Sequence, residues 1–281
     1  MAEKTLHEKY AALQADLAAR KKLAVAYSGG VDSTFLLAAA RAACESVLAI
    51  TACTDALPRR ELTEAEAYTT EQGIAHTVLQ LDAFAVPQFA ANAPDRCYHC
   101  KKSLFTAMRT AAAQQGFADL CEGSNADDAK DYRPGLAAIA ELKVASPLKA
   151  AGLTKADIRA LSRELGLPTW QKPSYACLAT RVPYDTPLSP ELLHKIGAAE
   201  QVLHTCGFTA GRVRCHGNVA RIELPPEQLD AALAPELRAR LSEGVKAAGF
   251  AYVALDLDGY RTGSLNETLP PETLAQSTAA H

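Results

Sequence analysis

A pair of glycines near the amino terminus marks the stretch of this sequence best suited to chemistry. The octapeptide Ser28–Phe35 follows the apolar run Leu23–Tyr27 and leads into a helical pattern over Thr34–Ala43. A strand that turns through glycine into a helix N-terminus exposes backbone N–H groups, and the helix dipole adds positive charge there. The pattern therefore predicts an anion site built from backbone and suited to phosphate.

Side chains of the same loop extend this prediction. The hydroxyls of Ser28 and Ser33 add hydrogen-bond donors, and Asp32 can hold the divalent cation that accompanies a nucleotide. The Walker A form of a phosphate loop is absent from the chain. The alternative is an ordinary turn between a strand and a helix. We predict that the nucleotide-binding residues here are Ser28, Gly29, Gly30, Asp32 and Ser33.

Three of the eight cysteines stand in settings that suggest chemistry. Cys97 and Cys100 form a C-x-x-C pair at the start of a helical pattern. This spacing suits a redox pair, half of a zinc site, or two ligands of an iron–sulfur cluster. Cys177 lies in a proline-rich loop, where Arg181 would favour its thiolate. Three cysteines around a four-iron cluster would leave one iron open to sulfide, and His99 is a further candidate ligand.

Two arginines further along the chain form a second candidate anion site. Arg212 and Arg214 alternate along a predicted strand, so both guanidinium groups point to the same side. Such a pair can hold a phosphate, and the alternative is a solvated strand face.

Composition indicates a soluble globular protein with a sizeable core. Of the 281 residues, 48% are hydrophobic and 22% are charged, and the net charge is −3. This balance gives no general attraction to nucleic acid or to an anionic membrane. The first twenty residues predict an amphipathic helix rather than a signal peptide, so we expect a cytoplasmic protein that binds neither.

The elements that must position these residues alternate between strands and helices. This order predicts an α/β fold with a parallel sheet and helices on both faces, whose ligands bind at the carboxyl ends of the strands. After Leu23–Tyr27 the predicted strands are Val47–Cys53, Ala75–Leu81, Phe117–Glu122 and Leu142–Ala145, and the predicted helices after Thr34–Ala43 are Arg60–Glu71, Tyr98–Gln115 and Lys155–Leu165.

Beyond residue 188 the pattern changes to a smaller α+β domain. Its predicted elements are a helix from Pro190 to Thr205, a β-hairpin over Arg212–Leu224, a helix over Glu227–Ala248 and a strand over Tyr252–Leu257. The predicted organisation is an ATP-binding domain (1–170), an active-site loop (171–188), a domain for substrate binding or oligomerisation (189–265) and a disordered tail (266–281).

The loop Ser28–Ser33 resembles the SGGxDS loop of the PP-loop, or N-type, ATP pyrophosphatases. The stretches 96–102, 172–181 and 212–214 together make the chain similar to the LarE family, over residues 23 to about 261. LarE is the sulfur transferase in biosynthesis of the nickel-pincer cofactor of lactate racemase. The resemblance implies the PP-loop fold, a homo-oligomer, and a place beside the other enzymes of that biosynthesis.

The resemblance also implies a reaction. ATP with Mg²⁺ adenylylates a carboxylate of pyridinium-3,5-biscarboxylic acid mononucleotide, and a sulfur nucleophile then displaces AMP to give a thiocarboxylate. Sulfur comes either from sacrifice of a cysteine at position 177 or from a [4Fe-4S] cluster on three cysteines. Because the chain has cysteines at 97, 100 and 177, we favour the cluster.

Further site residues follow from the same resemblance. Ser124 and Asp127 lie in a stretch similar to the GTNxDD-like segment of PP-loop enzymes and are predicted at the nucleotide. Asp127 and Asp128 could instead form an Asx-rich turn that caps the next helix. Glu200 and Glu223 are candidate carboxylates of a second divalent cation site.

The sequence also has to be weighed against three other functions. A PP-loop tRNA thiolase would need a basic RNA-binding surface or zinc-ribbon ends, and neither a basic run nor a second C-x-x-C pair is present. An amide-forming PP-loop synthetase would leave Cys177 and the C-x-x-C pair without a role. A regulatory module that binds a nucleotide or metal would carry out no chemistry.

Overall fold

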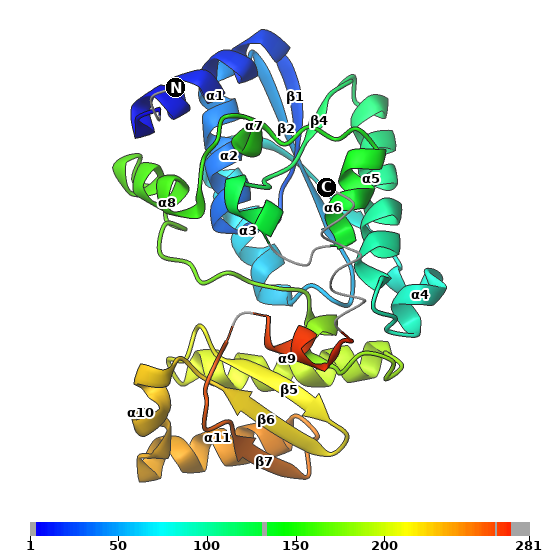
Figure 1. Cartoon of the computed structure of the whole chain (residues 1–281), viewed down its shortest axis with the longest axis vertical. Helices are drawn as coiled ribbons and strands as arrows, with labels where there is room; N and C mark the ends of the chain where they lie inside the picture. The colour runs from blue at the N-terminus through cyan, green and yellow to red at the C-terminus, as the bar shows by residue number, and fades with distance from the viewer. Residues whose placement is uncertain (1–3, 131–133, 262, 271–281) are drawn as a thin grey trace. The chain divides into compact units, whose positions relative to one another are not determined.

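The chain forms two compact units in the computed structural model, which describes residues 4–130, 134–261 and 263–270 (Figure 1). Of these residues, unit 1 contains 4–82 and 95–172, and unit 2 contains 83–94 and 173–270. The segment 83–94 therefore belongs with the second half of the chain. The pattern of the sequence carries no sign of this assignment.

Unit 1 is built on a parallel sheet of four strands in the order β3-β2-β1-β4. Along β1, Leu23 and Val25 pack into one hydrophobic cluster while Ala24 packs into another. Because strand side chains alternate between faces, these two clusters cover the two faces of the sheet. The strands are β1 (Lys22–Ala26), β2 (Ser46–Cys53), β3 (Ala75–Gln80) and β4 (Leu120–Cys121).

Helices cover both faces of this sheet, as expected for parallel strands joined by crossovers (Figure 1). One cluster contains side chains of α1, α2, α3, α7 and α8, and the other contains those of α5 and α6. The helices are α1 (Leu6–Arg20), α2 (Val31–Ala43), α3 (Arg59–Glu71), α5 (Arg96–Gln114), α6 (Pro134–Glu141), α7 (Pro147–Ala150) and α8 (Lys155–Glu164). The predicted α/β class is confirmed.

One predicted strand of unit 1 is wrong. The segment Leu142–Ala145 forms only an isolated bridge between Ala145 and Cys121. Lys143 has φ of 53°, in the left-handed region, so the backbone cannot stay extended through this position. The strand before it is also shorter than predicted, with only two residues in β4.

Unit 2 contains a sheet of three strands in the order β5-β6-β7. Strands β5 (Arg212–His216) and β6 (Val219–Glu223) form the predicted antiparallel hairpin, and β7 (Tyr252–Leu255) runs parallel to β6. Helix α9 (Pro190–Thr205) begins and ends where the sequence predicts. Its N-cap Ser189 accepts a hydrogen bond from the Leu192 N–H at 3.2 Å.

The long helix predicted over Glu227–Ala248 is wrong, because it is two helices. Helix α10 (Leu229–Leu233) ends before Ala234, whose ψ of 136° is extended, and α11 (Pro235–Ala247) begins directly after it. Proline disfavours the helical conformation in the residue that precedes it, and this explains the break.

The segment 83–94 includes a 3₁₀ turn (Ala83–Ala85) and α4 (Pro87–Ala90). The buried Asn92 side chain donates to the Pro183 carbonyl at 2.7 Å, and the Leu188 N–H donates to the Ala90 carbonyl at 2.8 Å. Hydrogen bonds of this kind, made by residues far apart in sequence, place the segment in unit 2.

The predicted tail 266–281 is described only in part. A 3₁₀ turn spans Ser264–Thr268, so the first residues of this tail are ordered, and 271–281 lie outside the described residues. Among the helices of the described part of the chain, none has the length and apolar character required to span a membrane.

Candidate active site

The loop Ser28–Ser33, here named the phosphate loop, leads from β1 into the N-terminus of α2, as predicted. Gly29 has φ of 71°, and a Cβ atom at this position would lie 3.2 Å from Cβ of Ala65. Only glycine fits both conditions without strain. The Ser28 and Ser33 hydroxyls lie 3.1 Å apart, and the Ser33 hydroxyl donates to the Gly30 carbonyl at 3.3 Å. These bonds join the two serines to each other and to the Gly30 carbonyl.

Asp32 lies in the first turn of α2 and has one oxygen available for a ligand. Its Oδ2 accepts from Lys155 Nζ at 2.6 Å, whereas its buried Oδ1 has no hydrogen-bond partner among the described residues. Burial raises the pKa of Asp32, while the charge of Lys155 acts in the opposite direction. An unpartnered buried carboxylate oxygen beside a helix N-terminus fits a divalent cation that arrives with a nucleotide.

The second polar stretch, Glu122–Asp128, approaches the loop closely. A Cβ on Gly123 would lie 3.1 Å from the Ser33 nitrogen, so a larger residue would press on the loop. Ser124 donates from its N–H at 3.0 Å and from its hydroxyl at 2.8 Å to the Glu122 carboxylate. Ser124 therefore lies at the predicted edge of the sheet, with its side chain turned to Glu122.

Asp127 has the structural role that the sequence left open. Its Oδ2 accepts from the N–H of Lys155, the first residue of α8, at 2.9 Å. Its own N–H donates to Oδ1 of Asn125 at 2.9 Å, as in an Asx turn, and Asp128 accepts from the Asn125 N–H at 2.9 Å. These bonds position the N-terminus of α8 and hence Lys155. A nucleotide contact by Ser124 or Asp127 stays a prediction.

Two of the three candidate cluster cysteines share one helix turn. Cys97 and Cys100 are half-buried in the first turns of α5, and His99 between them bonds to Asp95 at 3.0 Å. Cys177 is exposed and belongs to unit 2, directly before a 3₁₀ turn over Leu178–Arg181. Within the described residues no three His, Cys, Asp or Glu side chains form a group that could hold a metal ion.

Arg181 and Glu200 form a buried ion pair in unit 2. Arg181 is 2% exposed and Glu200 8%, and Nε lies 2.5 Å from Oε1. Burial opposes the charge of Arg181, but Glu200 more than compensates, so the pKa of the guanidinium is raised. Glu200 also accepts from the Val213 N–H at 3.1 Å. Because this carboxylate neutralises Arg181, the field that Arg181 can exert on a nearby thiol is weakened.

Arg214 on β5 is also paired with a carboxylate. Its Nη2 lies 2.8 Å from Glu223, and its Nη1 donates to the Thr180 carbonyl at 2.6 Å. Glu223 is shared, since Arg221 lies 3.1 Å from its other oxygen. Both candidate carboxylates of the second cation site are thus occupied by arginine, and the site stays a prediction.

Arg212 differs from its neighbours because no carboxylate pairs with it among the described residues. Its guanidinium donates to the Gly211 carbonyl at 2.9 Å and to the Ser174 carbonyl, and it lies 5.7 Å from the Tyr175 ring centre and 5.3 Å from that of Tyr260. Burial and the charge of Arg181 lower the pKa of Arg212. A buried cation without a counter-ion is a strong candidate for an anionic ligand.

The model of a family described as "Queuosine biosynthesis protein QueC" matches residues 22–96, which include the phosphate loop. The pyridinium-3,5-bisthiocarboxylic acid mononucleotide synthase of Lactiplantibacillus plantarum is 36% identical over 96% of this chain and 98% of its own length. The chain belongs to the LarE family.

Two further relatives are uncharacterized proteins. One from Synechocystis sp. is 40% identical over 87% of this chain and 92% of its own length. One from Methanocaldococcus jannaschii is 30% identical over 86% of this chain and 92% of its own length. The match to the Lactiplantibacillus plantarum synthase and to the family model confirms the predicted family and fold class.

Some side chains around these sites were missed by sequence reasoning. Lys155 and Lys172 both bond to the phosphate loop, and Tyr175 packs against two arginines. Lys172 and Tyr175 lie in the block that resembles LarE, which was the available signal. Lys155 follows a recognisable helix cap at Thr154, but its contact with Asp32 spans 123 positions of sequence.

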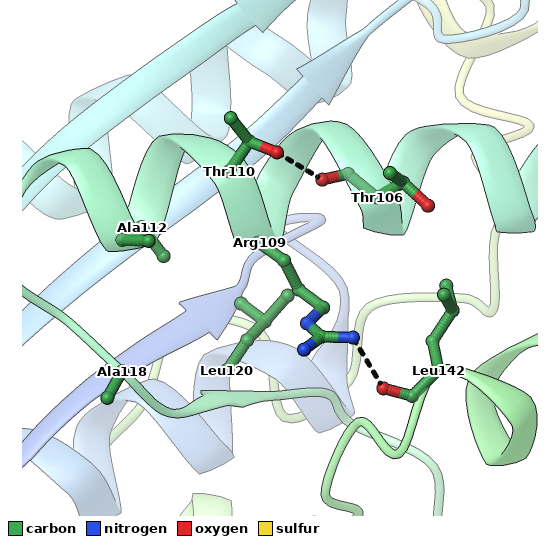
Figure 2. Close-up of a pocket in the computed structure, with 8 residues that line it drawn as sticks. Thr106, Arg109, Thr110, Ala112, Ala118, Leu120 and Leu142 are labelled. Carbon is green, nitrogen blue, oxygen red and sulfur yellow. Dashed lines mark hydrogen bonds between the residues drawn. The ribbon is translucent and has the colours of Figure 1, made fainter.

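A separate hollow of about 300 Å³ in unit 1 is not the nucleotide site (Figure 2). Leu120, the first residue of β4, lines it, so the hollow lies at the amino end of that strand, opposite to the phosphate loop. Arg109 spans it and donates to the Leu142 carbonyl at 2.9 Å (Figure 2). The lining residues are Thr106, Arg109, Thr110, Ala112, Ala113, Ala118, Leu120 and Leu142.

Proposed function

We propose that this LarE-family chain is an ATP-dependent sulfur transferase that acts on pyridinium-3,5-biscarboxylic acid mononucleotide. The observation that carries the proposal is the phosphate loop, in which a positive-φ glycine, a helix N-terminus and the unpartnered oxygen of Asp32 form a site for a nucleotide with its cation. The name of the Lactiplantibacillus plantarum relative supplies the class of substrate.

The first half of the reaction is activation of a carboxylate. A substrate carboxylate oxygen attacks the α-phosphorus of ATP, the bond to the β-phosphate oxygen breaks, and pyrophosphate leaves. The N–H groups at the start of α2 stabilise phosphate charge. Lys155, which donates a hydrogen bond to Asp32, lies beside them. Mg²⁺, held by Asp32, would neutralise charge on the leaving pyrophosphate. Ser124 and Asp127 complete the proposed nucleotide site.

The second half replaces AMP by sulfur. A sulfur nucleophile attacks the carbonyl carbon of the acyl adenylate, and AMP leaves with the electron pair of its bond, giving a thiocarboxylate. Cys97, Cys100 and Cys177 are the residues that would hold a [4Fe-4S] cluster, which supplies an open iron for sulfide. Two cysteines three positions apart in the first turns of a helix suit two ligands of such a cluster. The alternative source is the sulfur of Cys177 itself.

Unit 2 supplies the proposed binding site for the substrate. Arg212, which is held by carbonyls and aromatic rings rather than by a carboxylate, and Arg214 would bind the phosphate of the mononucleotide. Arg181 would orient Cys177, and Glu200 with Glu223 would bind a second divalent cation. We further propose a cytoplasmic homo-oligomer that works beside the other enzymes of nickel-pincer biosynthesis.

Pyrophosphate release is the decisive assay. The protein, with ATP and Mg²⁺, should release pyrophosphate when pyridinium-3,5-biscarboxylic acid mononucleotide is added. It should not do so when tRNA or precursors of NAD are added. Release with tRNA would favour a thiolase. Release with an ammonia source and an NAD precursor would favour an amide-forming synthetase. Binding of ATP without release under any of these conditions would favour a regulatory module.

Iron content decides the source of sulfur. Protein purified without oxygen should be brown and contain about four iron and four acid-labile sulfide per chain. Cys177→Ser should lower both contents, whereas Cys206→Ser, which changes another unit 2 cysteine, should not. Absence of iron, with loss of one sulfur atom from Cys177 during turnover, would overturn the cluster version and leave the sacrificial one.

A further inference from the structure

The ammonium group of Lys172 contacts both the phosphate loop and the neighbouring helix α3. Its Nζ donates to the Gly29 carbonyl at 3.1 Å, and it lies 2.8 Å from Glu61 and 2.6 Å from Glu64 on α3. Glu61 is almost fully buried. The lysine side chain itself is only 14% exposed. A half-buried ammonium with two hydrogen bonds and a close ion pair is a fixed group rather than a mobile surface charge.

The bond to Gly29 decides which way one peptide group of the loop faces. In a trans peptide the carbonyl oxygen of one residue and the N–H of the next point in opposite directions. Because Lys172 holds the Gly29 carbonyl, the Gly30 N–H faces away from the lysine. Among the described residues no acceptor takes this N–H, which lies at the N-cap of α2. It is therefore a donor left for a ligand.

A peptide between two glycines needs such a restraint. Glycine tolerates both signs of φ, so the Gly29–Gly30 peptide can rotate at low cost and turn its carbonyl toward a bound phosphate. Lys172 can resist that rotation only if its own backbone is fixed. Arg159 on α8 provides this, donating to the Trp170 carbonyl at 2.5 Å and to the Lys172 carbonyl at 2.8 Å.

We infer that Lys172 is a positioning residue that locks the Gly29–Gly30 peptide with its N–H facing the phosphate of the nucleotide. The inference rests on the proposed binding of ATP at this loop. The lysine acts through the peptide and does not touch the substrate. Removing the lysine should therefore lower the affinity of each ligand in proportion to its contact with the loop. Contacts made elsewhere in the nucleotide site should be unaffected.

The test compares Lys172→Met with the matched control Lys9→Met. Lys9 is also 14% exposed and also loses an ion pair, but its partner, at 2.9 Å, is Asp157 on α8 rather than a residue of the phosphate loop. Calorimetry on the full chain with Mg²⁺ measures the affinities for ATP, inorganic pyrophosphate and adenosine. Lys172→Met should lower the affinities for ATP and pyrophosphate about tenfold or more, which is the scale of a lost hydrogen bond to a charged group. The affinity for adenosine should stay unchanged.

Lys9→Met should bind all three ligands as the unmodified protein does, and Lys172→Arg, which keeps a donor, should recover part of the phosphate affinity. Equal loss of adenosine binding in Lys172→Met would overturn the positioning role, as would normal pyrophosphate binding. Failure of the unmodified protein to bind ATP or pyrophosphate would overturn the proposed function together with this inference.

Discussion

Unit 1 and unit 2 present positive charge to a ligand in different ways. In unit 1 the phosphate loop relies on backbone N–H groups, and its two nearby lysines, Lys155 and Lys172, bond to the loop's own oxygens. In unit 2 the charge is carried by buried guanidinium groups, of which Arg181 and Arg214 have carboxylate partners. Only Arg212 is held without one among the described residues.

The difference follows from the cost of burying charge. Backbone dipoles carry no net charge, so a helix N-terminus can be buried without a counter-ion. A guanidinium must be paired or bonded to other groups when it leaves water. Unit 2 is therefore expected to be sensitive to loss of a single charge, whereas unit 1 is expected to be sensitive to backbone shape.

The largest expected effect is on the buried ion pair of unit 2. Glu200→Ala leaves Arg181 buried without its carboxylate and should lower the free energy of unfolding by about 3–5 kcal/mol. Denaturant titration of the full chain measures it. Replacing both partners, as Arg181→Met with Glu200→Leu, should recover most of the loss. A change below about 1 kcal/mol in the single variant would show that charge pairing is not what stabilises this region.

The two arginines of β5 should respond differently to substitution because, among the described residues, only Arg214 is paired with a carboxylate. Arg214→Ala should weaken binding of the mononucleotide, spare ATP, and cost about 1–3 kcal/mol of stability, because it leaves the buried Glu223 with only Arg221. Arg212→Met should lower the affinity for the mononucleotide by at least as much, and it leaves no buried carboxylate without its partner. Calorimetry with each ligand, beside denaturation, separates the two effects. Unchanged binding in Arg214→Ala would remove that residue from the site.

Backbone shape in unit 1 is tested by Gly29→Ala against Gly73→Ala. Both glycines have positive φ, so each alanine should cost about 1–2 kcal/mol of stability. Only Gly29 has a neighbour within contact of the new methyl group, and only Gly29 lies in the phosphate loop. Gly29→Ala should lose ATP binding while Gly73→Ala retains it. Normal ATP binding by Gly29→Ala would show that the loop does not depend on this conformation.

The smallest expected effect concerns Tyr175. Its buried hydroxyl has no hydrogen-bond partner among the described residues, while its ring packs against Arg181 and Arg212. Tyr175→Phe keeps the ring and removes the unsatisfied group, so stability should stay equal or rise by about 1 kcal/mol. A thermal melt compares the two proteins. A clear loss of stability would mean that the hydroxyl is paired in the folded protein.

Local patterns in the sequence were enough to predict most elements. The Thr154 cap, the helix Pro190–Thr205 and the hairpin around Gly217 each follow from residues within a few positions of one another. The errors arose where one residue overrides a good periodicity, as Lys143 does for the predicted fifth strand and Pro235 does for the long helix. The segment 83–94 could not be assigned, because the Asn92 bonds that place it span about ninety positions.

The candidate sites also differ in whether they depend on neighbouring residues or on residues distant in sequence. The sequence alone determined the phosphate loop, because strand, glycine pair and helix N-terminus are contiguous and backbone chemistry is local. It also singled out three cysteines and two arginines by type and spacing. Packing of distant segments brings Lys155 and Lys172 to that loop and pairs Arg181 and Arg214 with carboxylates. It also leaves Arg212 without a carboxylate partner among the described residues. The state of a buried charge depends on neighbours distant in sequence, which only packing brings together.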